Sequence, residues 1–156
     1  MLALIQSDSI AVRERDCAIF MKRSILLVDD SKFMRRANEL ALIKAGYGVY
    51  SAGDGEEGLR VAREKLPDLI VLDMMLPKLS GPQLLDELKK DATTKNIPVI
   101  VLSSLPQKNA EKLKQSGAAA YFEKATLGVE NGSTCLIRAI EDVLRSPQAA
   151  CATASL

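Results

Sequence analysis

The feature that most constrains the fold is a short apolar run, Ile25-Leu26-Leu27-Val28, that ends in two adjacent acids, Asp29 and Asp30. Such runs are typical of a parallel strand that helices cover on both faces. In open α/β sheets, ligands bind beyond the carboxyl ends of the strands, which is where these two acids would lie. Neighbouring carboxylates repel each other and are costly to desolvate unless a cation joins them. The sequence therefore predicts a buried strand that leads into a site for a hard divalent cation.

The alternation of apolar strand and helical pattern continues along the chain. Further strands are predicted at 47–52, 69–72, 99–102 and 118–122. Helices are predicted from Ser31 to about Gly46, at 54–65, from Ser80, at 107–115 and at 133–144. Five strand–helix alternations predict an α/β fold with a parallel sheet and right-handed crossovers.

Local signals predict where the helices begin and end. Ser31 is a good N-cap for the first helix, and Gly46 supplies a left-handed stop. Between them, apolar and small residues follow at helical spacing: Phe33, Ala37, Leu40 and Ala41, with Lys44 one turn further. Asp54 and Glu57 form a capping-box-like start for the second helix, and Ser133 is the predicted N-cap of the last one.

Composition narrows the class of protein. The chain has 156 residues, enough for one domain, and its net charge of +1 favours neither a nucleic-acid platform nor an acidic tail. It contains no histidine, which excludes imidazole bases and a phosphohistidine carrier. Three widely spaced cysteines indicate reduced thiols, and no apolar run is long enough to cross a membrane. We therefore expect a cytoplasmic protein without membrane insertion.

The two ends of the chain lack the pattern of the rest. Residues 1–20 have no sustained hydrophobic periodicity. They are followed by Met21-Lys22-Arg23, which resembles an alternative start of the protein. We expect a disordered extension there, although a short docking helix over 10–20 is an alternative. Residues 148–156 are small and are expected to form a disordered tail. The predicted domain is 21–147.

Four of the five predicted strands end in a residue that can do chemistry. Asp29 and Asp30 follow the first strand, Asp73 the third, Ser103 the fourth and Lys124 the fifth. In a parallel sheet these ends share one edge. The acids can hold Mg²⁺, and the lysine and the hydroxyl can neutralise and orient phosphoryl oxygens. A carboxylate not used by the metal could be a nucleophile.

The chain from about Met21 to Arg145 resembles the receiver domain of bacterial two-component response regulators. The residues that carry the resemblance are four segments in the family's order and spacing: 25–31 (ILLVDDS), 69–77 (LIVLDMMLP), 98–104 (PVIVLSS) and 120–124 (AYFEK). The resemblance implies a flavodoxin-like three-layer sandwich, with a five-stranded parallel sheet in the order 2-1-3-4-5 and five flanking helices. The resemblance is to the stand-alone, CheY-like type, and we expect the chain to be a receiver of that type.

The resemblance also implies a role for each site residue. Asp73 would be the phosphoacceptor, and Mg²⁺ would be held by Asp29, Asp30, Asp73 and the backbone carbonyl of Met75. The phosphoryl group would be bound by Ser103, Lys124 and the backbone of Ser104, and Ser103 and Tyr121 would form the switch.

A receiver of this type implies partners and a mode of signalling. A histidine kinase or phosphotransfer protein would donate the phosphoryl group, and a downstream protein target would read the phosphorylated state. The protein would be a monomer or a phosphorylation-dependent dimer without direct nucleic-acid binding. It would not be an enzyme beyond its own phosphotransfer and dephosphorylation.

Two departures from the family keep alternatives open. Ala125 stands where the family usually has a proline in a cis peptide, and the segment 126–132 is longer than usual. One alternative is a receiver-like interaction module that phosphorylation does not switch. A haloacid-dehalogenase-type Mg²⁺-dependent phosphatase is less favoured, because that class needs an acid two residues after its nucleophile and Ser31 stands two after Asp29. A flavodoxin-like cofactor carrier is also less favoured, because no phosphate-cradling loop rich in Gly, Ser and Thr follows the first predicted strand.

Overall fold

The structure, a computed structural model, describes residues 22–104, 110–124 and 132–145. In these ranges, five parallel strands form one sheet in the order β2-β1-β3-β4-β5, as predicted. The strands are β1 (Ser24–Val28), β2 (Gly48–Ala52), β3 (Leu69–Asp73), β4 (Val99–Ser103) and β5 (Ala120–Glu123). The last strand begins two residues later than the sequence predicts.

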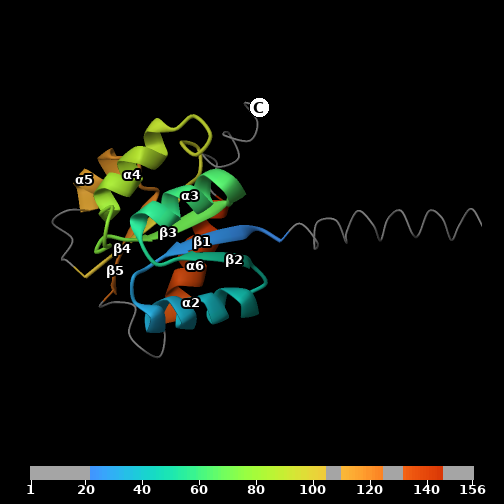
Figure 1. Cartoon of the computed structure of the whole chain (residues 1–156). Helices are drawn as coiled ribbons and strands as arrows, with labels where there is room; N and C mark the ends of the chain where they lie inside the picture. The colour runs from blue at the N-terminus through green and yellow to red at the C-terminus, as the bar shows by residue number, and fades with distance from the viewer. Residues whose placement is uncertain (1–21, 105–109, 125–131, 146–156) are drawn as a thin grey trace, which may run out of the picture.

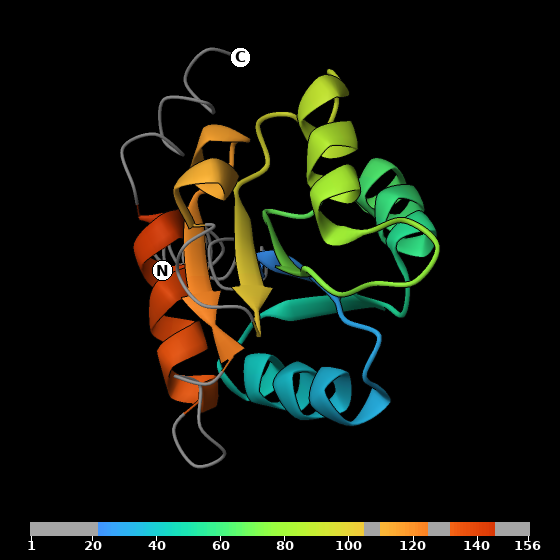
Figure 2. The ribbon, with the colours of Figure 1, turned by 90° about the vertical axis from the view of Figure 1, so that its left-hand side faces the viewer.

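Helices cover both faces of the sheet. Figure 1 shows α3 (Gly55–Lys65) and α4 (Gly81–Lys90) on one face, and α2 (Lys32–Lys44) and α6 (Gly132–Leu144) on the other. The short α5 (Ala110–Gln115) lies near β5, and Figure 2 shows this edge of the molecule with α6 running along it. The result is the predicted three-layer sandwich.

The residues of β1, β3 and β4 alternate between two separate cores, which explains the uninterrupted apolar runs in these three strands. In β1, Leu26 and Val28 pack with the helices α3 and α4, while Ile25 and Leu27 pack with α2 and α6. Both sets are buried. Because each face is covered by helices, polar side chains find their place only where the strands end.

Most helix ends form as the local signals predict. The Ser31 hydroxyl accepts a hydrogen bond from the Met34 N–H (3.4 Å), and the Asp54 carboxylate accepts one from the Glu57 N–H (2.8 Å). Gly46 adopts a φ of +98°, the left-handed conformation that a helix stop requires. The prediction for Ser133 is wrong, because α6 begins at Gly132 and places Ser133 inside its first turn.

Helix α2 forms as predicted, but its apolar stripe is not its buried face. Asn38 and Leu42 are the buried residues of α2, whereas Phe33 is 80% exposed and Leu40 45% exposed. Apolar residues in α2 therefore lie on its solvent side, and the stripe begins only a few residues after the acids at the end of β1.

Several expectations fall outside the described residues. These are the disorder of 1–20 and 148–156, the first residues of the predicted helix 107–115, the loop 126–132 except for Gly132, which begins α6, and the peptide bond between Lys124 and Ala125. Within the described ranges, no helix is long and apolar enough to cross a membrane.

Gly81 lets α4 begin directly against the end of β3. Its N–H donates to the carbonyl oxygen of Met74 (3.2 Å). A Cβ atom added at Gly81 would lie 2.5 Å from the Cα of Met74 and 2.8 Å from the carbonyl oxygen of Asp73. Backbone atoms cannot yield as a flexible side chain can, so this contact fixes how closely α4 approaches Asp73.

We predict that Gly81→Ala lowers the free energy of unfolding by about 1–3 kcal/mol, because overpacking outweighs the gain in helix propensity. Gly48→Ala is the matched control, since a Cβ there meets only the Arg23 carbonyl oxygen at 4.0 Å. Urea unfolding of both variants measures the difference. Equal stability of the two variants would contradict the proposed close contact.

Candidate functional site

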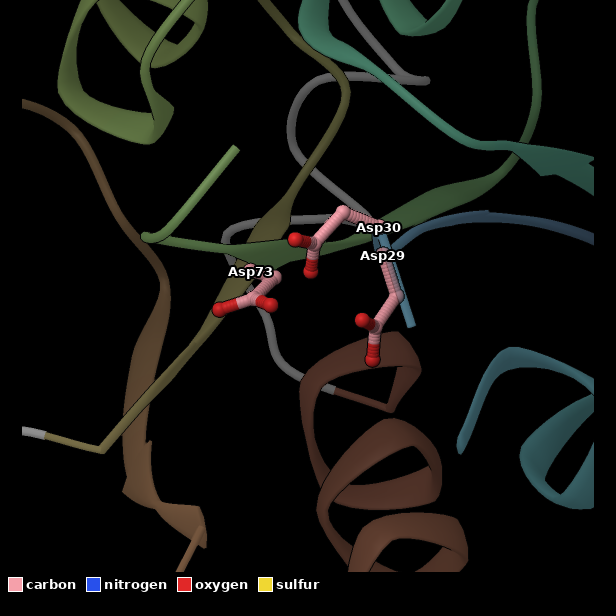
Figure 3. Close-up of side chains that lie close together, drawn as sticks. All are labelled: Asp29, Asp30 and Asp73. Atoms are coloured by element: carbon pink, nitrogen blue, oxygen red, sulfur yellow. The ribbon is translucent and has the colours of Figure 1, made fainter. Parts of the chain in front are cut away.

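Three carboxylates from the ends of two neighbouring strands form a cluster. Asp29 and Asp30 follow β1, and Asp73 ends β3. Each contributes an oxygen, and these oxygens all lie within 4.8 Å of one another (Figure 3). Asp29 and Asp73 are buried, whereas Asp30 is exposed. The cluster therefore has an open side through Asp30 and two acids set into the protein.

Asp29 is held in place but incompletely satisfied. Its Oδ1 accepts a hydrogen bond from the Ser31 N–H (2.9 Å), while its buried Oδ2 has no hydrogen-bond partner among the residues that the structure describes. Burial raises the pKa of the Asp29 carboxyl, and the charges of Asp73 and Asp30 add to that rise. The Ser31 N–H and the Lys124 ammonium oppose the rise without cancelling it. Ionised Asp29 is thus destabilised unless another positive charge joins it.

Lys124 follows β5, at the end of the sheet beyond β3 and β4, and its side chain reaches the acidic cluster. Its Nζ lies 2.7 Å from Oδ2 of Asp73 and 3.7 Å from Oδ2 of Asp29. Burial lowers the pKa of Lys124, but the hydrogen bond to Asp73 and the charges of the three acids together raise it above its usual value. Lys124 is therefore a protonated cation that balances only part of the negative charge of three carboxylates.

The segment after Asp73 is tied to the start of α3. The Met75 N–H donates to Oδ1 of Asp73 (3.2 Å), while the Met75 residue is 61% exposed. Further along, the Nζ of Lys78 lies 3.3 Å from Oδ2 of Asp54, the N-cap of α3. Gly55 follows that cap, and a Cβ there would collide with the Leu79 carbonyl oxygen. The backbone around Asp73 is thus fixed by α3 as well as by α4.

The remaining predicted residues lie along β4 and β5. Ser103 is the buried last residue of β4, directly after Leu102, the pairing partner of Asp73. Ser104 is exposed at the same edge. Tyr121 pairs with Val101 in the β-ladder and packs, partly buried, against the core on the α3–α4 side. Ser103 thus lies at the acidic edge, and Tyr121 lies further from the end of its strand.

Comparison with known proteins decides the family. The response regulator receiver domain family matches residues 25–129, which is more than half of the chain. The chain belongs to the response-regulator receiver family. The polar-differentiation response regulator DivK of Brucella anthropi is 33% identical over 105 residues, which span 67% of this chain and 85% of DivK.

Solved receiver structures share the fold. The chemotaxis response regulator CheY4 of Vibrio cholerae superposes with a TM-score of 0.71 at 26% identity, covering 80% of this chain and all of CheY4. The receiver domain of the Francisella response regulator 1452 gives a TM-score of 0.63 at 32% identity, over 67% of this chain and 85% of that one.

Other relatives are longer. A probable transcriptional regulator, ycf27 of Guillardia theta, is 38% identical over 90 residues, which make up 58% of this chain and 34% of that protein. This receiver therefore spans about a third of the length of that curated relative. The likeness covers the receiver part, and the activity of the longer protein is not transferred by it.

The acidic cluster of this receiver fits a bound Mg²⁺. Receiver domains bind Mg²⁺ at an acidic site, and this chain has its acidic cluster at the sheet edge described above. Carboxylate oxygens are the ligands that Mg²⁺ prefers, and the exposed side at Asp30 leaves room for its waters. The hydrogen-bond capacity left on Oδ2 of Asp29 agrees with a missing positive partner.

One residue at this site was not predicted from the sequence. Arg35, on the first turns of α2, donates from Nη1 to the backbone carbonyl of Asp29 (2.6 Å). A basic residue six positions after an acid was the available signal, but surface arginines are common in helices and carry little information alone. The contact became visible only when α2 was placed against the end of β1.

We predict that Mg²⁺ stabilises the folded receiver, because a cation relieves the repulsion among ionised acids only when they are assembled. The gain is about 1.4 kcal/mol when free Mg²⁺ is tenfold above its dissociation constant. The raised pKa of Asp29 means that its protonation on acidification stabilises the metal-free fold, so the Mg²⁺ effect should shrink as the pH falls from 7.

Thermal melts with Mg²⁺ and with chelator, at pH 7 and at lower pH, measure this effect. Asp29→Asn serves as the comparison, since an amide keeps an acceptor for Ser31 and removes one charge. This variant should melt higher than wild type in chelator and gain little from Mg²⁺. A wild-type melt that is insensitive to millimolar Mg²⁺ would contradict the assignment.

Proposed function

We propose that this receiver takes up a phosphoryl group on Asp73 in a Mg²⁺-dependent reaction and signals through protein contacts that depend on phosphorylation. The observation that carries the proposal is the salt bridge between the Lys124 Nζ and Oδ2 of Asp73 (2.7 Å), set beside two further acids. This arrangement supplies a nucleophilic carboxylate, a cation for phosphoryl oxygens and a place for a divalent metal.

The metal would be held by Asp29, Asp30, Asp73 and the backbone carbonyl of Met75. When bound, Mg²⁺ would neutralise charge between the acids and the phosphoryl oxygens. Asp73 is buried and restrained by the Met75 N–H and by Lys124, so its carboxylate is oriented before a donor arrives. Such restraint reduces the entropy lost in reaching the reactive geometry.

In the transfer step, a carboxylate oxygen of Asp73 forms a bond to phosphorus. The bond from phosphorus to the donor, a phosphohistidine nitrogen or an acyl oxygen, breaks, and its electron pair leaves with the donor. Lys124 then exchanges its contact with Asp73 for one with a phosphoryl oxygen. Ser103 and the backbone of Ser104 would donate to the remaining oxygens, because both lie at the same edge.

We propose that the donor is a histidine kinase or a phosphotransfer protein, as membership of the family implies. The exposed apolar stripe of α2, which includes Phe33 and Leu40, begins beside the acidic edge and offers a surface for a protein donor. We also propose a cytoplasmic location and a downstream protein target. A relative that is a transcriptional regulator shows that some receivers of this type belong to longer proteins.

The two rival functions have less support. A haloacid-dehalogenase-type phosphatase would need a second acid two residues after its nucleophile, but Ser31 stands there after Asp29, and the family match is to receivers. A receiver that phosphorylation does not switch would have no need for the ion pair between the buried Asp73 and the partly buried Lys124. The experiments below separate these alternatives.

We predict uptake of one phosphoryl group per chain, on Asp73, only when Mg²⁺ is present. Intact-mass measurement after incubation with acetyl phosphate, and separately with a histidine-phosphorylated donor protein, tests this. Asp73→Asn should abolish uptake, while Asp86→Asn, an exposed acid of α4, should leave it unchanged. Uptake that persists in Asp73→Asn or in chelator would refute the assignment.

The switch is a separate proposal. Phosphorylation adds about −1.5 to −2 charge at Asp73, and the Ser103 hydroxyl would move toward it. Tyr121, whose ring packs partly buried against the α3–α4 core, would respond by reorienting. The surface of β4, β5 and α5 would then present a different shape to a partner. A partner can respond to phosphorylation only if it binds the phosphorylated and unphosphorylated conformations with different affinity.

We predict that Ser103→Ala still takes up the phosphoryl group but shows a smaller response around Tyr121 and α5. Amide-exchange or NMR shift changes on adding beryllofluoride, a phosphoryl mimic, measure the response. Ser116→Ala is the control, because its hydroxyl bonds only locally to the Lys112 carbonyl (2.9 Å) in α5. A response in Ser103→Ala as large as in wild type would show that this hydroxyl is not the link.

A further inference from the structure

Asp29 is restrained through its backbone as well as its side chain. Its N–H donates to the Ala52 carbonyl at the end of β2 (3.1 Å). Its carbonyl accepts from Nη1 of Arg35 at 2.6 Å, a short hydrogen bond from a charged donor. The peptide unit that joins Asp29 to Asp30 is planar, so a bond to this carbonyl fixes the peptide from which both acidic residues extend.

The guanidinium of Arg35 is itself held by the loop between β2 and α3. It lies against Gly53, where an added Cβ would be 3.1 Å from Nη1 of Arg35. The N–H of Gly53 donates to Oε2 of Glu57 in α3 (2.9 Å), which holds this loop in place. The absence of a side chain at Gly53 therefore leaves space for Arg35 between the loop and the end of β1.

The neighbouring Arg36 shows what an ordinary helix arginine does in the same turn. Its side chain is 64% exposed and forms an i,i+3 ion pair with Glu39 (3.3 Å). Such exposed pairs contribute little to stability. The side chain of Arg35 is instead partly buried. It reaches from α2 to the backbone carbonyl of Asp29.

We infer that Arg35 is a positioning residue for the cation site, and that Gly53 is its required neighbour. The inference rests on the proposed function, because it assumes that Asp29 and Asp30 hold Mg²⁺. The hydrogen bond of Arg35 goes to the backbone carbonyl of Asp29 and not to a carboxylate oxygen. It acts through the Asp29 carbonyl, by keeping the two carboxylates at the spacing and direction at which the ion meets them.

Loss of a residue that orients a metal ligand weakens metal binding by about 10–100-fold. The side chains of Asp29 and Asp73 keep their other hydrogen bonds in this variant. We therefore expect Arg35→Gln to raise the Mg²⁺ dissociation constant by about tenfold, the lower end of that range. Arg36→Gln, the matched control, should leave the constant unchanged. The constant is read from the melting temperature of the full chain against Mg²⁺ concentration, with each variant's melt in chelator as its own baseline.

Gly53→Ala provides an independent arm. Its new methyl group should displace the guanidinium and weaken Mg²⁺ binding in the wild-type background. In the Arg35→Gln background the methyl group meets no guanidinium, so Gly53→Ala should add little further loss. A double-mutant cycle on the Mg²⁺ dissociation constants measures this non-additivity.

Three results would overturn the inference. In the first, Arg35→Gln lowers the melting temperature in chelator but binds Mg²⁺ as tightly as wild type, which would make Arg35 merely structural. In the second, the effects of Gly53→Ala and Arg35→Gln on Mg²⁺ binding add independently. In the third, wild type itself does not bind Mg²⁺, in which case the proposed function fails together with this inference. Wild-type binding with unaltered variants would reject the inference alone.

Discussion

The site depends on the balance between three crowded carboxylates and one ammonium group. Asp29 and Asp73 are buried, where ionised acids are unfavourable, and Lys124 offsets only part of their charge. The imbalance appears as the raised pKa of Asp29 and as its Oδ2, which accepts no hydrogen bond from the described residues. Under the proposed function, this excess of negative charge would attract Mg²⁺, and the metal would then neutralise charge on an incoming phosphoryl group.

The fold maintains this imbalance by holding backbones close together. Both faces of the sheet are buried under helices, so the strand ends are where charged groups gather. Gly81 brings α4 against the end of β3, and Gly55 brings α3 against the segment that follows Asp73. Gly53 leaves space for Arg35 at the end of β1. The end of β3 at Asp73 is thus supported by helices that pack without an intervening side chain, whereas Asp29 is supported through the Arg35 side chain.

Much of this architecture could be predicted from the sequence, because it depends on local patterns. Uninterrupted apolar runs indicated buried strands, and the acids after them indicated the edge at which they meet. The N-caps Ser31 and Asp54 were correct, since a cap depends on residues within one turn. The sheet order came from the resemblance to receivers and is confirmed.

The features that could not be predicted depend on how segments distant in the sequence pack against each other. The helical spacing of Phe33 and Leu40 predicted α2 correctly but did not indicate which face is buried, because apolar side chains also make up much of a normal protein surface; the helix buries Asn38 and Leu42. The contact of Arg35 with the Asp29 carbonyl could not be inferred, because it requires the loop at Gly53 to arrive from a different part of the chain. Neither the local sequence pattern nor the composition shows how closely these two segments approach each other.

We propose that Asp29, Asp30 and Asp73 jointly hold a cation beside a reactive Asp73. The decisive experiment is a crystal structure grown with Mg²⁺ and beryllofluoride. We predict an octahedral ion bound to oxygens of all three residues, and a beryllofluoride group on Asp73 with the Lys124 ammonium against one fluorine. An ion bound elsewhere, or beryllofluoride absent from Asp73 at saturating concentrations, would contradict it.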